Sequence, residues 1–222
     1  MSTLVIAIDG PSGSGKSSTA RGVAERLGFA YLDTGAMYRA MTWALLQRGI
    51  DVADVDAVAS TAGQISIEGG TDPLSLQISA DGVDVSSSIR NVEVTAAVSA
   101  VSAVSQVRRL LVAQQRSYIA QATKGIVVEG RDIGSVVAPD ARVKVYLVAH
   151  QDARAARRTA ELGGDEDNVA VTGADLARRD RLDSSRATSP LVRADDAVVL
   201  DTTERTLQQV IDEVVRIVDQ RR

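Results

Sequence analysis

The sequence predicts an α/β fold in which helices cover both faces of a parallel β-sheet. Short runs of apolar, largely β-branched residues recur along the 222-residue chain, and segments with helical periodicity separate them. Strands that are apolar on both faces are typical of parallel sheets buried between helices. A glycine-rich loop joins the first apolar run to the first helical segment. Together these observations predict a doubly wound sheet.

The first strand and the first helix are the most clearly marked elements. The run at residues 4–8 is apolar throughout and is expected to be a strand. Ala20, Val23 and Leu27 then recur at helical spacing, and Gly28 is expected to end the helix that starts at Lys16. The remaining strands are expected at residues 29–32, which form the weakest run, 126–128, 143–148 and 197–200. The remaining helices are expected at residues 35–48, 91–121, 151–162, 173–184 and 205–221.

Two segments interrupt this alternation. Residues 64–90 contain short alternating apolar runs, separated by the turn sequences Gly69-Gly70, Asp72-Pro73 and Asp81-Gly82. We expect a small inserted subdomain of hairpins there. Residues 163–168 form a polar, acidic stretch between helices that carry arginines. This stretch is either an exposed loop or a mobile lid, and the sequence leaves both interpretations open.

Composition limits the domain organisation and the choice of partners. A chain of this length can bury a full hydrophobic core, and we expect residues 1–222 to form one domain. The net charge of -4 and the aromatic content of 3% argue against a nucleic-acid partner. The chain has no cysteine, which excludes disulfides and thiolate metal sites. No apolar run approaches the roughly twenty residues that span a bilayer, so we expect no membrane partner, a cytoplasmic location and, by default, a monomer.

The glycine-rich loop matches a motif whose mechanism is known. It has the pattern of the phosphate-binding P-loop, in which glycines adopt backbone angles that turn several N–H groups toward a polyphosphate. Lys16 is expected to reach the β and γ phosphates, and the Ser17 hydroxyl is expected to bind magnesium. We therefore expect ATP and Mg²⁺ to bind here. The residues of this donor site are Gly10, Pro11, Ser12, Gly13, Ser14, Gly15, Lys16, Ser17 and Ser18.

The rest of the chain discriminates among the classes of P-loop protein. A GTPase would need an Asn-Lys-x-Asp motif, which is absent. Motor and AAA-type ATPases usually end a core strand with paired acids, whereas here Glu129 is followed by Gly130 and Arg131. This difference favours a small-molecule kinase, in which arginines hold a phosphate-bearing acceptor. The candidate arginines are Arg39, Arg90, Arg108, Arg131, Arg179 and Arg186, with Arg154, Arg157 and Arg158 at the possible lid.

Three further motifs carry a resemblance to a known family. They are Asp-Thr-Gly-Ala-Met-Tyr-Arg at residues 33–39, Glu-Gly-Arg-Asp-Ile-Gly at 129–134, and Arg-Asp-Arg-Leu-Asp-Ser-Ser-Arg at 179–186. With the P-loop and the insert after Gly63, they make essentially the whole chain resemble the bacterial cytidylate kinases. The resemblance implies a P-loop kinase fold whose five-stranded parallel sheet has the order 2-3-1-4-5. It also implies ATP-dependent phosphorylation of CMP and dCMP, an acceptor-binding region at 34–91 that includes the hairpin insert 64–90, and a lid at 154–170.

The same resemblance assigns roles to individual residues. It implies that the acceptor phosphate is held by Arg39, Arg131 and Arg186. It implies that cytosine is faced by Ser99, Arg108 and Asp132. Near the sugar it places Arg179 and Asp183, and along the acceptor pocket Tyr38 and Thr34, the latter at a position where some members have serine. The residues expected to carry catalysis are Lys16, Arg131, Asp132 and, from the lid, Arg157.

Hydrogen-bonding chemistry supports the choice of base independently of the family. A carboxylate such as Asp132 accepts from the exocyclic amine of cytosine while Arg108 donates to the ring acceptors, and uracil reverses this pattern. Two alternatives remain open: a P-loop kinase for another small acceptor such as UMP or shikimate, and a non-catalytic nucleotide-binding switch.

A few polar residues have open or structural interpretations. Glu129 either orients a magnesium-bound water or pairs with a nearby arginine. Ser102 and Ser105 are interpreted as packing residues of a helix, and the lone His150 as a structural residue.

Overall fold

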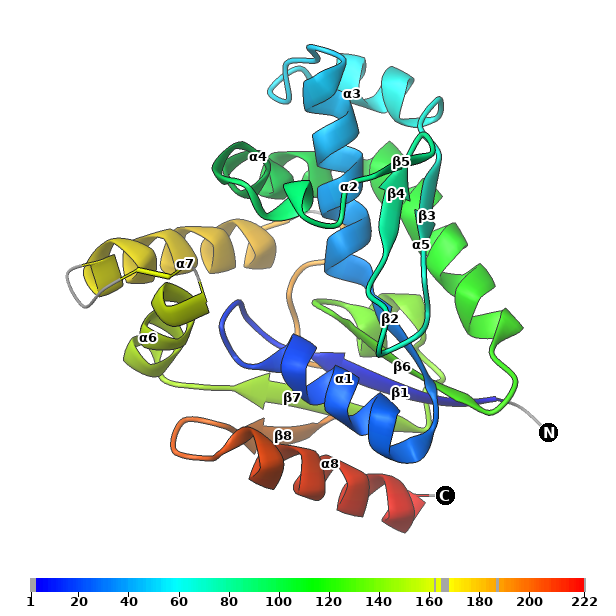
Figure 1. Ribbon diagram of the computed structural model, residues 1–222, viewed down its shortest axis with the longest axis vertical. Helices are drawn as coiled ribbons and strands as arrows, with labels where there is room; N and C mark the ends of the chain where they lie inside the picture. The colour runs from blue at the N-terminus through cyan, green and yellow to red at the C-terminus, as the bar shows by residue number, and fades with distance from the viewer. Residues whose placement is uncertain (1–2, 162, 165–167, 187, 222) are drawn as a thin grey trace.

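The core of the fold is a parallel sheet with the expected strand order. The computed structural model describes residues 3–161, 163–164, 168–186 and 188–221. Within these residues, five parallel strands form one sheet in the order β2-β6-β1-β7-β8 (Figure 1), which is the predicted order 2-3-1-4-5. The strands are β1 (Leu4–Asp9), β2 (Ala30–Asp33), β6 (Gly125–Gly130), β7 (Val143–Val148) and β8 (Val198–Asp201).

Helices cover both faces of this sheet. On one face, α1 (Lys16–Leu27) and α8 (Leu207–Arg221) pack with the strands around Ile6, Val127 and Val214. On the other face, α2 (Thr34–Gln47) and α5 (Ser105–Gln121) form a second apolar cluster with the sheet. The inner strand β6, which lies between β2 and β1, is buried along its whole length, as expected of a strand between two helical layers.

The prediction of a single helix at residues 91–121 is wrong, because the structure has two helices there. These are α4 (Val92–Ala103) and α5, which meet at an angle of 93°. Val104 takes an extended conformation (φ -70°, ψ 118°) at the break. The break lets α4 pack against α2 while Val107 and Leu111 of α5 join the apolar cluster of the sheet. The side chains of Val101 and Val107 are both fully buried as a result. Among the described helices, none is by itself long and apolar enough to cross a membrane.

The insert forms its own small sheet, as predicted. In the described chain it comprises three antiparallel strands, β3 (Ile67–Gly69), β4 (Ile78–Ala80) and β5 (Val83–Asp84). The connection between β3 and β4 reaches back to the main sheet, where the carbonyl of Thr71 accepts a hydrogen bond of 2.8 Å from the backbone N–H of Tyr31 in β2. The insert is therefore attached to the free edge of the core sheet.

Two further helices lie near the carboxyl ends of the strands. Helices α6 (Gln151–Glu161) and α7 (Val169–Ser184) pack against each other beside the loop that follows β1 (Figure 1). Residues 162 and 165–167 of the predicted lid lie outside the described part of the chain. Three short helical elements were not predicted: α3 (Val55–Ala62), the 3-10 turn η1 (Ser88–Arg90) and the π-helical turn η2 (Ile133–Val137).

Candidate active site

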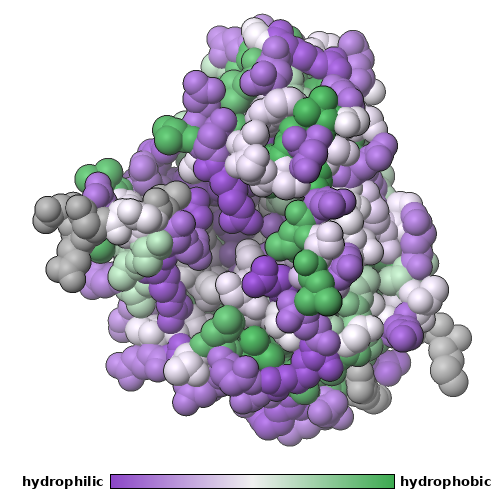
Figure 2. Space-filling model, viewed as in Figure 1, coloured by the Kyte–Doolittle hydropathy of each residue, from purple (hydrophilic) through white to green (hydrophobic). Residues whose placement is uncertain are grey.

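The candidate site lies where the doubly wound sheet changes direction. The chain leaves β1 toward β2 on one side and crosses from β6 to β7 on the other, and the register places Asp9 of β1 opposite Gly130 of β6. Ligands of open α/β sheets bind at this position, beyond the carboxyl ends of the strands. A cavity of about 390 Å³ lies there, and Figure 2 shows hydrophilic residues gathered around a hollow in this face.

The loop after β1 has the backbone conformation of an anion cradle. Gly10, Gly13 and Gly15 all have positive φ angles, of 151°, 75° and 85°. A Cβ atom at Gly10 would lie 2.3 Å from the carbonyl oxygen of Leu147 in β7, so only glycine fits this turn. The loop then leads directly into α1, whose first residues Lys16, Ser17 and Ser18 line the cavity, and a helix N-terminus favours a bound anion.

Lys16 is buried at the bottom of this loop. Its ammonium group donates a hydrogen bond of 2.7 Å to the carbonyl of Pro11. Burial lowers the pKa of Lys16, and the nearby charge of Arg131 lowers it further. The carboxylates of Glu129, Asp9 and Asp180 oppose this lowering only in part, and a phosphate anion in the cavity would oppose it further.

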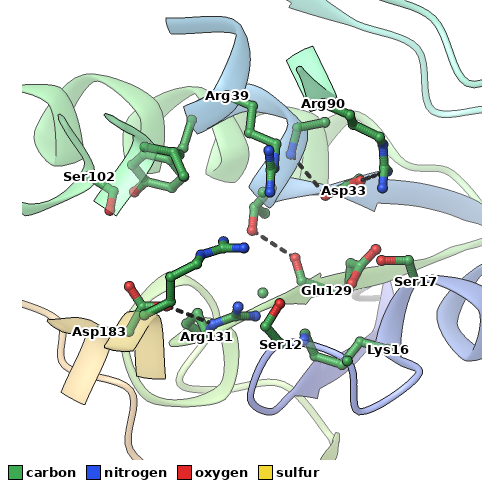
Figure 3. A pocket seen from close by; sticks show the side chains of 18 of the residues that line it. Ser12, Lys16, Ser17, Asp33, Arg39, Arg90, Ser102, Glu129, Arg131 and Asp183 are labelled. Atoms are coloured by element: carbon green, nitrogen blue, oxygen red, sulfur yellow. Dashed lines mark hydrogen bonds and ion pairs between the residues drawn. The ribbon is translucent and has the colours of Figure 1, made fainter. Parts of the chain in front are cut away.

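Glu129, at the end of β6, lines the cavity beside Ser17 and near Lys16 (Figure 3). The hydroxyl of Tyr31 donates a hydrogen bond of 2.6 Å to its carboxylate, and the Ser17 hydroxyl also faces it. Burial raises the pKa of Glu129, with a further rise from the charge of Asp33. Of the two interpretations of Glu129, pairing with an arginine is not observed among the described residues.

Asp9 joins the donor loop to the motif that follows β6. Its carboxylate accepts hydrogen bonds of 2.8 Å from the backbone N–H groups of both Ile133 and Gly134. Burial raises its pKa to about 6, although these two hydrogen bonds oppose the rise. No local sequence pattern marks Asp9 as a site residue, because its partners lie more than 120 positions along the chain.

At one end of the cavity, a buried ion pair joins Arg108 and Asp132. The guanidinium of Arg108 also donates to the carbonyl of Ser102 at 3.2 Å and lies over the ring of Tyr38, 5.3 Å from its centroid. Both charged side chains are less than a tenth exposed. The Nε of Arg108 is buried with no hydrogen-bond partner in the described structure. Ser99 lines the same end of the cavity.

Next to this pair, Asp183 of α7 holds two of the expected phosphate-binding arginines. Arg131 donates to one carboxylate oxygen at 3.0 Å and to the carbonyl of Gly10 at 3.1 Å. Arg186 lies 3.0 Å from the other oxygen. Asp183 thereby fixes both guanidinium groups at the wall of the cavity, as the close view shows for Arg131 (Figure 3).

Two further arginines face the cavity with no carboxylate partner in the described chain. Arg39 donates to the carbonyl of Ile89 at 3.1 Å and to the Thr95 hydroxyl at 2.9 Å. Burial and neighbouring arginines lower the pKa of Arg39 to about 9 and that of Arg179 to about 10. Clustered cations of this kind favour a bound anion.

The structure brings most of the predicted residues to one cavity. All the expected acceptor residues line it, as do Ser12, Gly13, Gly15, Lys16, Ser17 and Ser18 of the donor loop. Arg157 does not, because its guanidinium donates to the carbonyls of Thr202 and Thr203 after β8. Arg158, one position later on α6, lines the cavity in its place.

Some lining residues were not predicted from the sequence. Ser102 was interpreted as a packing residue, but it lines the cavity and its hydroxyl lies 3.4 Å from the guanidinium of Arg186. Its spacing of three residues from Ser99, on the same helical face, was the available signal. The other lining residues without an assigned role are Arg21, Tyr31, Asp33, Gly35, Ala36, Leu76, Val98, Gly130 and Glu161.

A glycine-rich loop in an anion-cradle conformation and an arginine-lined cavity lie together at the switch point of a five-stranded parallel sheet. This combination is typical of the P-loop kinases. The family model for cytidylate kinase matches residues 6–220. The chain therefore belongs to the cytidylate kinase family.

Individual relatives agree with this assignment. The chain is 55% identical to the cytidylate kinase of Streptomyces griseus subsp. griseus, over 100% of this chain and 95% of that protein. It is 53% identical to the cytidylate kinase of Rhodococcus opacus, over 99% of this chain and 96% of the relative. The fold is also similar to that of a gluconokinase from Sinorhizobium meliloti, with a TM-score of 0.51 at 14% identity over 98% of this chain and 92% of the other.

Proposed function

We propose that the protein transfers the γ-phosphoryl group of ATP to CMP and dCMP. The observation that carries the proposal is the buried pair of Arg108 and Asp132, which lies in the same cavity as the donor loop and the acceptor arginines. An acceptor nucleotide can then place its base at this pair and its phosphate among the arginines, facing the donor.

The chemistry of the pair favours cytosine over uracil. The Asp132 carboxylate is an acceptor for the exocyclic amine, while Arg108 has donors for the ring nitrogen and carbonyl. Uracil would set a carbonyl against the carboxylate, and each lost or mispaired buried hydrogen bond costs about 1–3 kcal/mol.

The cationic side chains supply the alignment that phosphoryl transfer requires. The transition state is loose, so the protein mainly has to position the two phosphates and neutralise their charge. Lys16 binds the phosphates of the donor, whereas Arg39, Arg131 and Arg186 bind the phosphate of the acceptor. The Asp132 carboxylate is held by Arg108 in this arrangement, so its proposed role is to bind the base rather than to accept a proton.

A magnesium ion fits the oxygen atoms near the donor loop. The Ser17 hydroxyl is exposed in the cavity, and the Glu129 carboxylate faces it. Among the described residues, no group of three or more ligating side chains forms a complete metal site, so the phosphates would provide most of the ligands. Such an ion neutralises phosphate charge, and Ser17 with Glu129 would hold it directly or through water.

An acceptor panel tests the proposal. ADP release is measured with Mg-ATP and CMP, dCMP, UMP, AMP, shikimate or no acceptor. We expect turnover with the two cytosine nucleotides, with kcat/KM roughly ten- to several-hundred-fold above that for UMP. Equal use of UMP or preference for shikimate would indicate another small-molecule kinase, and binding of ATP without turnover of any acceptor would indicate a nucleotide-binding switch.

A further inference from the structure

An ion pair between α6 and α7 contacts the donor loop at Ser12. Asp180 of α7 pairs with Arg154 of α6, and the side chains are only 18% and 11% exposed. The Asp180 carboxylate also accepts from the backbone N–H of Ser12 at 3.3 Å, while Arg154 donates to the Ser12 carbonyl at 3.1 Å. One pair of opposite charges thus contacts both polar groups of a single peptide residue in the P-loop.

The two contacts differ in chemical character. The N–H groups of a P-loop are anion-binding donors, and Ser12 lines the cavity. A carboxylate oxygen on this N–H therefore occupies a position suited to a phosphate oxygen. The separation of 3.3 Å lies beyond the usual range for N–H···O bonds, so the contact is weak and can be exchanged.

The contact with Arg154 is a fixed one. Arg154 donates to the carbonyl oxygen of Ser12, and a phosphate oxygen, which is itself an acceptor, cannot take the place of Arg154 on that carbonyl. In addition, a Cβ atom at Gly13 would lie 2.9 Å from the backbone oxygen of Arg154, so the loop and α6 are packed backbone to backbone. Arg154 therefore holds the loop in shape whether or not a nucleotide is bound.

The position of Lys16 indicates which part of the donor would reach Ser12. The Lys16 ammonium donates a hydrogen bond to the carbonyl of Pro11, the residue that precedes Ser12 in the chain. A P-loop lysine serves the β and γ phosphates. The N–H of Ser12 is therefore at the terminal-phosphate end of the loop.

We infer that Asp180 is an internal anion of the donor site, which occupies the N–H of Ser12 until the terminal phosphate of the donor displaces it, and that Arg154 is a positioning residue for the same loop. This inference rests on the proposed use of ATP as donor, which binding of ATP to the wild-type protein tests separately. In this arrangement Asp180 competes with the donor phosphate for the Ser12 N–H, and Arg154 supports the loop.

The two members of the ion pair should consequently have opposite effects on donor binding. Removing Asp180 frees a donor N–H and removes a negative charge from the phosphate site, so ATP should bind more tightly. Removing Arg154 loses the support of the loop and a positive charge, so ATP should bind more weakly. A pair with only a structural role would shift both in the same direction.

Calorimetric titration with ATP, without acceptor, tests this inference. We expect the Kd for ATP to fall roughly three- to tenfold in Asp180→Asn and Asp180→Ala, less so for ADP, and to rise roughly tenfold in Arg154→Met. Asp175→Asn is the matched control, because Asp175 forms an exposed ion pair with Arg178 on the same helix and should leave the Kd unchanged. Unchanged or weaker ATP binding in the Asp180 variants would overturn the inference.

A second measurement needs no variant. In the wild-type protein, NMR should show that inorganic tripolyphosphate moves both the Ser12 amide resonance and the carboxyl resonance of Asp180, because the carboxylate leaves the loop. An Asp180 carboxyl resonance that stays fixed at saturating tripolyphosphate would contradict the exchange.

Discussion

Lys16 is the residue whose protonation is most closely linked to the donor. Its pKa is lowered in the free protein by burial and by Arg131. Above the lowered pKa the free lysine is neutral, and phosphate oxygens restore the ammonium form. ATP binding should therefore take up a proton near pH 8, and ATP affinity should decrease as the pH rises further.

Calorimetry in two buffers of different ionisation enthalpy measures this uptake. The Lys16→Met protein should fold, show much less proton uptake and lose turnover by roughly 10³-fold or more. The same uptake in wild type and Lys16→Met would show that another group titrates.

Asp132 should determine the choice of base. In Asp132→Asn an amide replaces the acceptor for the cytosine amine, so kcat/KM for CMP should fall roughly 10- to 100-fold. The ratio of kcat/KM for CMP to that for UMP should fall as well. The acceptor panel checks both, with the exposed Asp140→Asn as control. An unchanged ratio would remove Asp132 from base recognition.

Two neighbouring arginines on α6 show that a sequence pattern does not determine which of two adjacent side chains faces the cavity. Arg157 and Arg158 both carry the same charge on α6, yet only Arg158 lines the cavity. Neighbours on a helix point about 100° apart, and the tertiary orientation of α6 decides which one faces the site. Similarly, Tyr31 reaches Glu129 across 98 positions, a contact that no local pattern specifies.

At the scale of elements, the start of β6 depends on close packing at Gly125. A Cβ atom there would lie 2.5–2.7 Å from the ring of Phe29, which is largely buried. Gly125→Ala should therefore lower the free energy of unfolding by about 1–3 kcal/mol. Gly63→Ala is the control, because Gly63 has a helical φ of -68° and open space around it.

Urea unfolding of both variants gives the comparison. A Gly125→Ala protein as stable as wild type would mean that the ring moves aside at no cost.

The elements that were predicted well have local signals. The helix α1 has helical spacing and a terminal glycine, Gly28, with a φ of 63°. The break at Val104 has neither glycine nor proline, and a β-branched residue can stand in a helix or in extended backbone. Only the packing of α4 against α2 and of α5 on the sheet determines it.

At the scale of the whole molecule, the excess of cations around the cavity should make stability depend on anions. Arg39 and Arg179 have no carboxylate partner in the described chain, and their pKa values are lowered to about 9 and 10. Millimolar phosphate should raise Tm by several degrees relative to chloride at equal ionic strength, because it binds the folded state.

The increase in Tm caused by phosphate should be clearly smaller in the Arg39→Gln protein. The exposed Arg216→Gln, whose arginine pairs with Glu213 on α8, is the control and should respond like wild type. An identical response of all three proteins would mean that phosphate acts through the solvent rather than at the cavity.

The hydrogen bond from the backbone N–H of Tyr31 to the carbonyl of Thr71 occupies a backbone donor on β2. This strand is at the border of the sheet, where its outward polar groups could otherwise pair with another polypeptide. The insert thus shields this border against self-association. We expect a protein with a shortened connection between β3 and β4 to self-associate while it is still folded.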